Sequence, residues 1–261
     1  MPLPVPHDVA RASGGAAVAE PVTPVSASAH VFVDDLAEPR LVDGDQRHLG
    51  RVLRLRPGAA VTASDGEGRW RSCRLGAGPE LEVAGEVVAD ERPDPPITIA
   101  FAVVKGDRPE LVVQKLTEVG VDRIVPFVAE RSVVRWDAAK VERQSVRFAD
   151  IARQAAMQCR RTFLPRVDAL SDFRAVAELP GAGLAERTGV PPSLSVPTLL
   201  IGPEGGWGLA EKASRLPSVR IGAHTLRSET AAITAGALLV AIRSRLVGEC
   251  VPSQVEGPHA P

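Results

Sequence analysis

The chain has 261 residues, 44% of them hydrophobic, and a formal net charge of -1 at pH 7. The length allows two modest globular domains, and the near-neutral balance gives by itself no indication of a polyanionic partner. Three cysteines, Cys73, Cys159 and Cys250, lie far apart without a CxxC pair, which argues against a disulfide framework or a zinc site and favours a reducing cytoplasm.

Both ends of the chain have compositions that predict disorder. Residues 1–29 are rich in Ala, Pro, Val and Ser, and prolines at that density block helix and sheet, so we expect a disordered tail. No signal peptide is expected, because a basic start and an unbroken apolar core are both missing. The most apolar window, 231–242, is too short for a transmembrane helix. Residues 249–261 are expected to be frayed.

Residues 30–94 are expected to form a small β-barrel. Short alternating runs at 30–33, 60–63, 70–75 and 81–83 are separated by turn signals. Seven arginines lie between residues 47 and 74, and Leu49, Val52 and Leu53 follow a helical spacing that leaves the arginines on the opposite side. A basic face of this kind suits a phosphate backbone, although a solvated face balanced by acids elsewhere explains the same run.

A proline-rich break at residues 91–96 predicts the boundary to a second domain. The continuous apolar run 97–104 is typical of a strand buried on both faces of a parallel sheet. Asp107 and Glu110 predict the start of a helix that ends at Gly120. A further strand is expected at 123–128, where Pro126 favours an edge position.

A long helix is predicted to begin after the cap residue Asp137, with Val141, Phe148, Ile151, Ala152, Ala155 and Ala156 on its apolar side. The segment 131–166 contains nine basic residues and only three acidic ones. This second basic cluster strengthens the nucleic-acid hypothesis, with a solvated helix as the alternative. Residues 180–197 are interpreted as an exposed loop. The alternation of strands and helices from 97 to 246 predicts an α/β domain with a mainly parallel sheet.

Two glycine-containing loops follow the apolar strands predicted at 198–201 and 219–221. The first, residues 202–208, contains four glycines and one proline, and glycine lets backbone groups approach a ligand closely. Neither a Rossmann fingerprint nor a P-loop occurs, so the loop is not a diphosphate cradle. The histidines show no metal or triad spacing, and His224 in the second loop either touches a ligand or completes a local hydrogen bond.

Six motifs follow one another at 105–108, 114–120, 130–134, 155–161, 201–206 and 226–232. In their order and content the chain resembles, from about residue 30 to residue 246, the RsmE family, which comprises the 16S ribosomal RNA uracil-N3 methyltransferases of the SPOUT superfamily. Two details depart from the family pattern. Trp207-Gly208 replaces a more usual aromatic-Ser pair, and Cys159-Arg160-Arg161 stands where Ser/Cys-Gly-Arg is common.

The resemblance implies an α/β fold with a SPOUT-type, trefoil-knotted methyltransferase domain at residues 95–248 and a mainly parallel sheet. A small PUA-like RNA-binding β-barrel at residues 30–94 precedes it. The resemblance further implies S-adenosylmethionine held in the knot, 16S ribosomal RNA in the small ribosomal subunit as the partner, and a homodimer. We expect a cytoplasmic protein that uses neither a membrane nor a metal.

The resemblance also implies the site residues. Backbone groups of the two loops are expected to bind the cofactor: Leu200, Ile201, Gly202, Glu204, Gly205, Gly206, Ile221, Gly222, Leu226, Arg227 and Thr230. Core packing is the equal alternative for Ile201 and Leu226. Contacts to RNA are expected from Arg47, His48, Arg51, Arg54, Lys105, Arg108, Arg131, Gln158, Arg160 and Arg161.

Arg227 and Glu229 are the expected catalytic residues. When uracil N3 loses its proton, negative charge spreads onto the flanking carbonyl oxygens, and Arg227 would stabilise that charge. Glu229 would accept the proton or orient Arg227, or would simply be a favourable charge at a helix N-terminus.

Two other functions fit the same motifs. The chain could be a SPOUT methyltransferase that acts on transfer RNA or on a ribose 2′-hydroxyl. Alternatively, it could be a non-catalytic RNA-binding ribosome assembly factor. The PUA-like barrel favours the uracil-N3 reaction, and the intact Arg227, Glu229 and Thr230 with the loop 202–206 argue against a pure binder.

Overall fold

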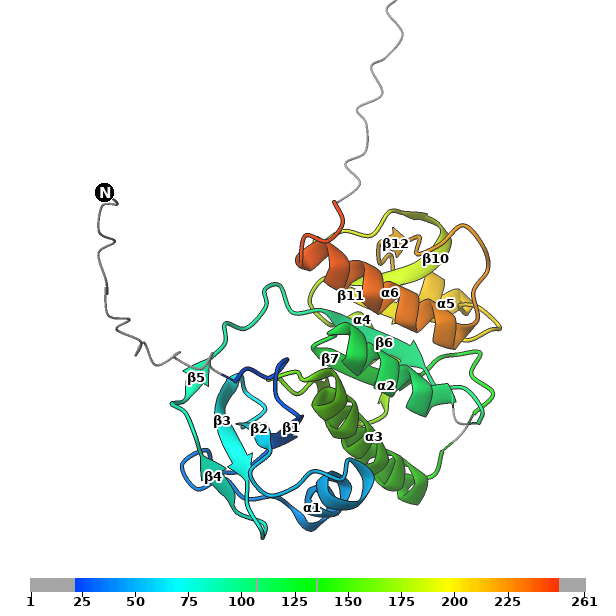
Figure 1. The fold of residues 1–261 in the computed structure, drawn as a ribbon. Helices are drawn as coiled ribbons and strands as arrows, with labels where there is room; N and C mark the ends of the chain where they lie inside the picture. Colours follow the sequence, from blue (N-terminus) through cyan, green and yellow to red (C-terminus); the bar gives the residue numbers. More distant parts are fainter. Residues whose placement is uncertain (1–21, 107, 135, 249–261) are drawn as a thin grey trace, which may run out of the picture.

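The structure is a computed structural model, and residues 22–106, 108–134 and 136–248 are described (Figure 1). The predicted frayed end 249–261 and residues 1–21 of the predicted tail lie outside them. Residues 22–29 of that tail do have a defined structure, because strand β1 begins at Ala29 and Ser28 N–H donates to the carbonyl of Ala60.

The N-terminal domain is a mixed five-stranded sheet with one short helical segment. The sheet has the order β1-β2-β3-β4, and β5 also pairs with β3; β1 and β2 are parallel and the other pairs antiparallel. All four predicted strands are present. The elements are β1 (Ala29–Phe32), α1 (Asp43–Arg47), the π-helical turn η1 (His48–Val52), β2 (Ala60–Ser64), β3 (Arg69–Leu75), β4 (Leu81–Val83) and β5 (Val88–Ala89).

The apolar helix face predicted beside the arginines of this domain is only partly correct. Leu49 is buried with 1% exposure, but Val52 and Leu53 are 65% and 45% exposed. The reason is local geometry: the segment forms a single π-helical turn that ends near Arg54, whose φ is 54°. A regular α-helix would have aligned the three side chains on one face.

The second domain is built on a seven-stranded sheet in which every pairing is parallel. Its strand order is β12-β10-β11-β6-β7-β8, with β9 also beside β7. The strands are β6 (Thr98–Ala102), β7 (Arg123–Val128), β8 (Arg166–Val167), β9 (Ser171–Asp172), β10 (Ala182–Val190), β11 (Thr198–Ile201) and β12 (Ser218–Val219). Predicted boundary residues 94 and 95 lie between β5 and β6; the domain limits themselves stay a prediction.

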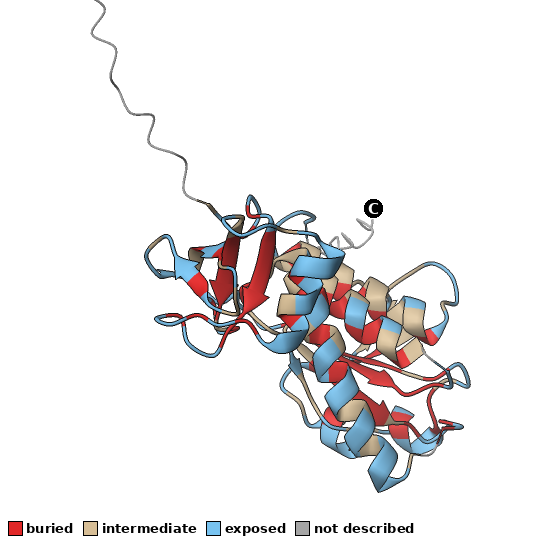
Figure 2. Cartoon of the chain, turned by 60° about the horizontal axis from the view of Figure 1, so that its bottom comes forward, coloured by how far each residue is buried: buried red, intermediate tan, exposed pale blue. Residues whose placement is uncertain are grey.

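Helices cover both faces of this sheet, as the buried strands between them show (Figures 1 and 2). Ile99 and Phe101 of β6 pack towards α2 (Arg108–Val119), α3 (Ala138–Cys159) and α6 (Ser228–Arg243). Ala100 and Ala102 belong to the opposite layer, which α4 (Phe173–Ala177) covers. The short helix α5 (Leu209–Lys212) follows the first glycine loop. Successive strand residues therefore serve two cores.

The helix ends follow the predicted signals. Helix α2 stops before Gly120, whose φ of +101° is strained for any side chain, and Asp137 accepts a hydrogen bond of 2.7 Å from the backbone N–H of Lys140 at the start of α3. The cap predicted at Asp107 lies outside the described residues. Within the described part of the chain, none of the helices combines the length and apolarity needed to cross a bilayer.

The interpretation of residues 180–197 as an exposed loop is wrong for residues 182–190, whereas residues 191–197 do form a loop. Residues 182–190 form β10, an interior strand between β12 and β11. The prediction failed because the glycines of this strand were interpreted as loop residues. In the structure they are required by close packing: a Cβ at Gly189 would lie 2.4 Å from the backbone of Ser218. Glycine inside a strand commonly marks such a close backbone approach.

The edge position predicted from Pro126 is also wrong. Strand β7 pairs with β6 along one side and with β8 and β9 along the other. Pro126 sits between the two short partners, since β8 pairs with residues 123 and 124 and β9 pairs with residues 127 and 128. The break between β8 and β9 lets an interior strand tolerate a residue without an N–H donor.

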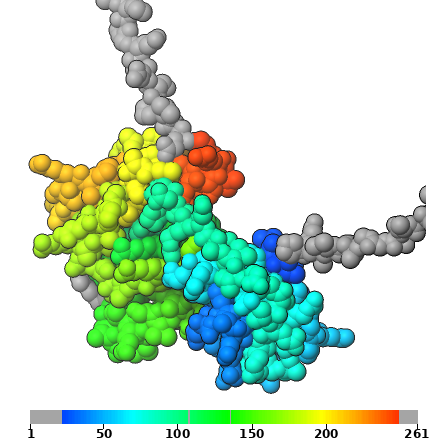
Figure 3. All heavy atoms as spheres, turned by 90° about the vertical axis from the view of Figure 1, so that its left-hand side faces the viewer, coloured from blue at the N-terminus to red at the C-terminus, as the bar shows by residue number. Residues whose placement is uncertain are grey.

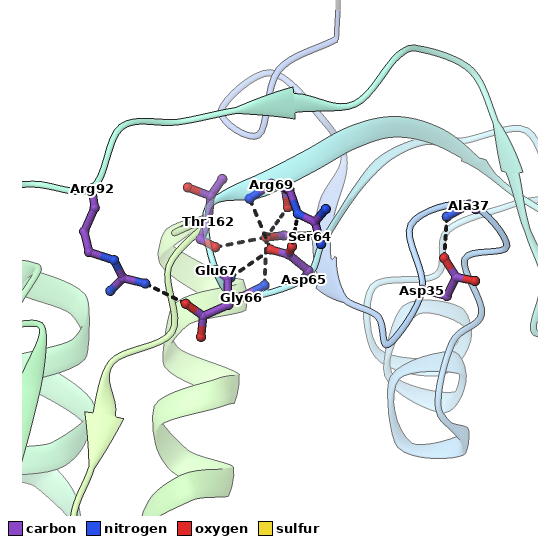
Figure 4. A network of polar contacts seen from close by, with 9 residues as sticks. All are labelled: Asp35, Ala37, Ser64, Asp65, Gly66, Glu67, Arg69, Arg92 and Thr162. Atoms are coloured by element: carbon purple, nitrogen blue, oxygen red, sulfur yellow. Dashed lines mark hydrogen bonds and ion pairs between the residues drawn. The ribbon is translucent and has the colours of Figure 1, made fainter.

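The two domains lie directly side by side (Figure 3), and the segment that follows α3 forms the joint. Ser64 Oγ donates to the carbonyl of Thr162 at 3.0 Å, and Thr162 Oγ1 donates to Asp90 at 2.6 Å. Figure 4 shows the contact between Ser64 and Thr162 beside the turn that begins at Ser64. Arg153 of α3 adds an ion pair of 2.6 Å to Asp45 of the first domain. The joint is therefore polar and well satisfied.

His30 lies at the centre of this joint and is 2% exposed. Its Nε2 is 3.0 Å from the carbonyl of Arg161, and its Nδ1 is 2.8 Å from Thr62 Oγ1. A carbonyl only accepts, so Nε2 carries the proton and Nδ1 accepts from the hydroxyl. Burial, assisted by the charge of Arg160, lowers the pKa of His30 from 6.5 to about 4.

The free energy of unfolding is accordingly expected to fall as the pH drops from 6.5 towards 4, because His30 then binds a proton in the unfolded chain but stays neutral in the native protein. The full loss is on the order of 3 kcal/mol. Urea unfolding across this range measures it. His30→Gln is the control, since glutamine keeps a donor and an acceptor without titrating; equal pH dependence in the two proteins would contradict the expectation.

Candidate functional site

A cavity of about 370 Å³ lies where the loops after β11 and β12 meet the end of β10. Two larger hollows lie along α2 and α3 and at the domain joint. The smaller cavity is the candidate site because it lies beyond the carboxyl ends of parallel strands, where ligands of α/β sheets bind. It is lined by Ala185, Glu186, Arg187, Thr188, Ile201, Gly202, Pro203, Glu204, Gly206, Trp207, Lys212, Ile221, Gly222, His224, Thr225, Leu226, Ser228 and Ala231.

Trp207, a residue of the first glycine loop, anchors this loop to the protein core. The indole is 4% exposed, stacks on Phe127 at 6.3 Å and contacts Phe173 edge-on. Its Nε1 donates to the carbonyl of Ala185 at 3.2 Å, which joins the loop to β10. A Cβ at Gly202 would lie 3.2 Å from the same indole. Glycine at this position therefore lets the loop lie close to its anchor.

A buried carboxylate fixes the far end of the same loop. Glu211 is 2% exposed, and its two oxygens accept from the backbone N–H groups of Glu130 at 2.8 Å and Gly208 at 2.7 Å. Gly208, which lacks a capping side chain, is the N-cap of α5, and Glu211 supplies the reciprocal capping bond. The carboxylate thereby ties the loop after β11 to the loop after β7.

The second loop is joined to the first at the start of α6, where Ser228 Oγ donates to the carbonyl of Gly202 at 3.1 Å. This bond brings together two segments that are 26 residues apart in the sequence. The two glycine loops predicted from the sequence therefore do enclose one cavity.

Most residues predicted to bind a cofactor line this cavity, and four do not. Those on its surface are Ile201, Gly202, Glu204, Gly206, Ile221, Gly222 and Leu226. Leu200 is fully buried in the layer facing α4, because it alternates with Ile201 along β11. Gly205 lies against Arg131, whose Nη1 donates to its carbonyl at 3.0 Å. Arg227 and Thr230 are exposed at the start of α6.

The prediction missed the wall that β10 contributes, Ala185–Thr188. These residues carry no ligand motif, and their strand was interpreted as a loop. The one sequence signal that could have indicated the strand is the short apolar run that ends at residue 185. Trp207, Lys212, Ser228 and Ala231 were also missed as lining residues. His224, which the sequence left open, does line the cavity.

The two predicted catalytic side chains differ in their surroundings. Arg227 is exposed, and its guanidinium makes no hydrogen bond or ion pair with any residue that the structure describes. Glu229 is 12% exposed, and its Oε1 is 3.7 Å from Nε of Arg108. Its Oε2 is buried without a partner among the described residues. The guanidinium of Arg227 is thus available to bind a ligand, whereas the carboxylate of Glu229 is held by Arg108.

The residues predicted to contact RNA fall into two groups. Those exposed to solvent are Arg47, His48, Arg51, Arg54, Lys105 and Gln158, together with Arg131 despite its bond to Gly205. The others use their donor groups on other residues of the protein. Arg161 donates to the carbonyls of Thr117 and Val121, both at 2.9 Å, and burial lowers the pKa of its guanidinium. Arg108 is ion-paired with Glu204 at 2.7 Å.

Arg160 occupies the position where the family commonly has glycine, and its backbone explains that preference. It caps α3 with a φ of 63°, in the left-handed region that favours glycine. Its guanidinium donates to the carbonyls of Pro24, Ala27 and Ser28. The arginine therefore fixes the segment before β1 at the joint, and its donors are used there.

Comparison with known proteins agrees with this geometry. An RNA methyltransferase domain matches residues 90–240, and an RNA methyltransferase PUA domain matches residues 41–84. Ribosomal RNA small subunit methyltransferase E of Mycobacterium tuberculosis is 31% identical over 240 residues, covering 82% of this chain and 92% of that protein. The enzyme of the same name from Bacillus subtilis is 33% identical over 131 residues, which cover 49% of this chain and 51% of that protein.

Two solved structures are similar over most of their length. A ribosomal RNA small subunit methyltransferase E from Neisseria gonorrhoeae, bound to S-adenosyl methionine, has a TM-score of 0.70 and 27% identity, covering 83% of this chain and 97% of that one. A putative methyltransferase from Legionella pneumophila, in complex with the same cofactor, has a TM-score of 0.70 and 27% identity, covering 81% and 96%. The predicted SPOUT-type fold with a preceding PUA domain is confirmed.

The fold and the cavity at its strand ends define an RNA methyltransferase of the SPOUT class with an N-terminal PUA domain. Sequence identity over most of both chains narrows the class further. The chain belongs to the ribosomal RNA small subunit methyltransferase E family.

Proposed function

We propose that the protein transfers the methyl group of S-adenosylmethionine to N3 of a uridine in the 16S ribosomal RNA of the small ribosomal subunit. The observation that carries the proposal is the single cavity enclosed by the two glycine loops and the end of β10. The names of the similar proteins and the cofactor in two similar structures support it.

The cavity suits this cofactor in size and in lining. Its volume falls within the range of about 300–1,000 Å³ that small-molecule sites occupy. Ile201, Ile221 and Leu226 offer apolar walls for the adenine, and Gly202 and Gly222 leave backbone groups accessible beside them. When bound, S-adenosylmethionine supplies an electrophilic methyl group. In this proposal Leu200 and Gly205 hold the first loop without lining the cavity, and Thr230 belongs to the first turn of α6.

Arg227 and Glu229 are proposed to act on the base. The free guanidinium of Arg227 would donate to the uracil carbonyl oxygen on which charge develops as N3 loses its proton. Glu229 lies two residues further, at the first turn of α6, with one oxygen unpartnered among the described residues. Glu229 would accept the N3 proton or orient Arg227, and a target base would have to leave its stack to reach the site.

The proposed RNA face comprises the solvent-exposed residues Arg47, His48, Arg51, Arg54, Lys105, Arg131 and Gln158. Arg160 and Arg161 are left out because their donors are used within the joint. We further propose domain limits of 30–94 and 95–248 and a homodimer, which the resemblance implies. We also propose a cytoplasmic location, which agrees with the free thiols of Cys73 and Cys159. Light scattering measures the dimer.

Two measurements test the proposal. Isothermal titration is expected to show binding of S-adenosylmethionine, and absence of binding would favour an RNA-binding assembly factor. Small subunits from cells that lack the enzyme are incubated with the protein and S-adenosylmethionine. They are expected to gain a methyl group that stops primer extension at one uridine, because N3 methylation blocks base pairing. Methylation of transfer RNA, or of a ribose 2′-hydroxyl, would instead establish the rival SPOUT activity.

A further inference from the structure

We propose that Arg108 is a positioning residue that holds the first glycine loop and the start of α6 together beside the cofactor cavity. The inference rests on the proposed function, since it concerns how that cavity is kept in shape. The sequence placed Arg108 among the RNA contacts, and the structure gives its side chain other partners.

Arg108 is the first residue of α2 and lies between two carboxylates from distant parts of the chain. Its Nη1 is 2.7 Å from Oε1 of Glu204, and its Nε is 3.7 Å from Oε1 of Glu229. Glu204 lines the cavity from the loop after β11, and Glu229 lies in the first turn of α6. One guanidinium thus connects three segments: the start of α2, the first glycine loop and α6.

The charges of this cluster argue against a direct phosphate contact. One guanidinium faces two carboxylates, so the group carries a net negative charge and repels a phosphate oxygen. Without Arg108, the two carboxylates would lose their shared counter-charge, and the loop that carries Glu204 would lose this link to α6. An exposed ion pair adds little stability by itself, so the expected effect is on the shape of the cavity.

The contact also accounts for the state of Glu229. Oε1 faces the guanidinium, while Oε2 is buried with no partner among the described residues. Arg108 therefore fixes the orientation of the Glu229 carboxylate in the first turn of α6, where the neighbouring residues Ser228 and Ala231 line the cavity. Since Arg108 acts through Glu204 and Glu229, it positions the site and does not touch the reacting atoms.

Titration of S-adenosylmethionine without RNA separates positioning from RNA contact. Arg108→Gln is expected to weaken cofactor binding roughly tenfold, and Glu204→Gln is expected to do the same because it breaks the same contact from the other side. The double variant should be no weaker than either single variant, and Arg108→Lys should restore part of the affinity. Equal thermal midpoints show that the fold is retained, and Glu204→Gln still tests the contact if Arg108→Gln does not fold.

Arg174→Gln is the matched control, because Arg174 is an exposed arginine that is ion-paired with Glu178 and does not line the cavity. It should leave cofactor affinity unchanged. Unchanged affinity in Arg108→Gln, with a salt-dependent loss of RNA binding, would overturn the inference and restore Arg108 as an RNA contact. That result differs from failure of the proposed function, in which the wild-type protein itself would not bind S-adenosylmethionine.

Discussion

Arg227→Ala is expected to lower the single-turnover rate of methyl transfer to small ribosomal subunits by about 100-fold or more. Removal of one preorganised donor to a developing oxyanion has an effect of this size, because the donor strengthens as the charge forms. Arg227 suits this task since it is exposed beside the cavity and no described residue uses its guanidinium. Cofactor binding should change little, as the side chain does not line the cavity.

Two further variants sharpen this test. Arg227→Lys keeps the charge but loses the planar fork, so an intermediate rate is expected. Arg245→Ala removes an exposed arginine just after the other end of α6 and should retain the wild-type rate. Rapid-quench measurement with labelled cofactor gives all three rates. A near-normal rate in Arg227→Ala would remove Arg227 from the mechanism.

Trp207→Ala is expected to destabilise the protein by about 3–5 kcal/mol, the usual range for truncation of a large buried aromatic side chain. The indole is 4% exposed and packs on Phe127 and Phe173. Its loss also frees the first glycine loop from β10, because the bond to the Ala185 carbonyl disappears. Cofactor affinity should therefore fall together with stability, whereas a purely structural core residue would affect stability alone.

Trp207→Phe is the matched control, because it keeps the aromatic packing and removes only the indole N–H. A loss of about 1 kcal/mol is expected from the missing hydrogen bond. Urea unfolding gives the stabilities, and calorimetric titration gives the affinities for S-adenosylmethionine. If Trp207→Ala bound the cofactor with wild-type affinity, the loop would not depend on its anchor.

Local patterns predicted much of the fold because the forces behind them act over a few residues. The apolar run at 97–104 contains β6, and Asp137 caps α3, since strand alternation and capping bonds are read within one or two turns of chain. The strand at 182–190 escaped this reading. Its glycines are explained by residues that lie further along the chain: Gly189 approaches the backbone of Ser218, and Gly183 approaches Val196 and the carbonyl of Pro217.

The sequence by itself determined the family and the two glycine loops near the end of the chain, because each is recognised in contiguous residues. Only folding brings these loops and the end of β10 together into one cavity. Only the tertiary structure decided which cations are free. Arg227 is open, Arg161 is buried against backbone carbonyls, and Arg108 pairs with Glu204, 96 residues away. An arginine has the same charge in every setting, and its role depends on the carboxylates and carbonyls that folding brings to it.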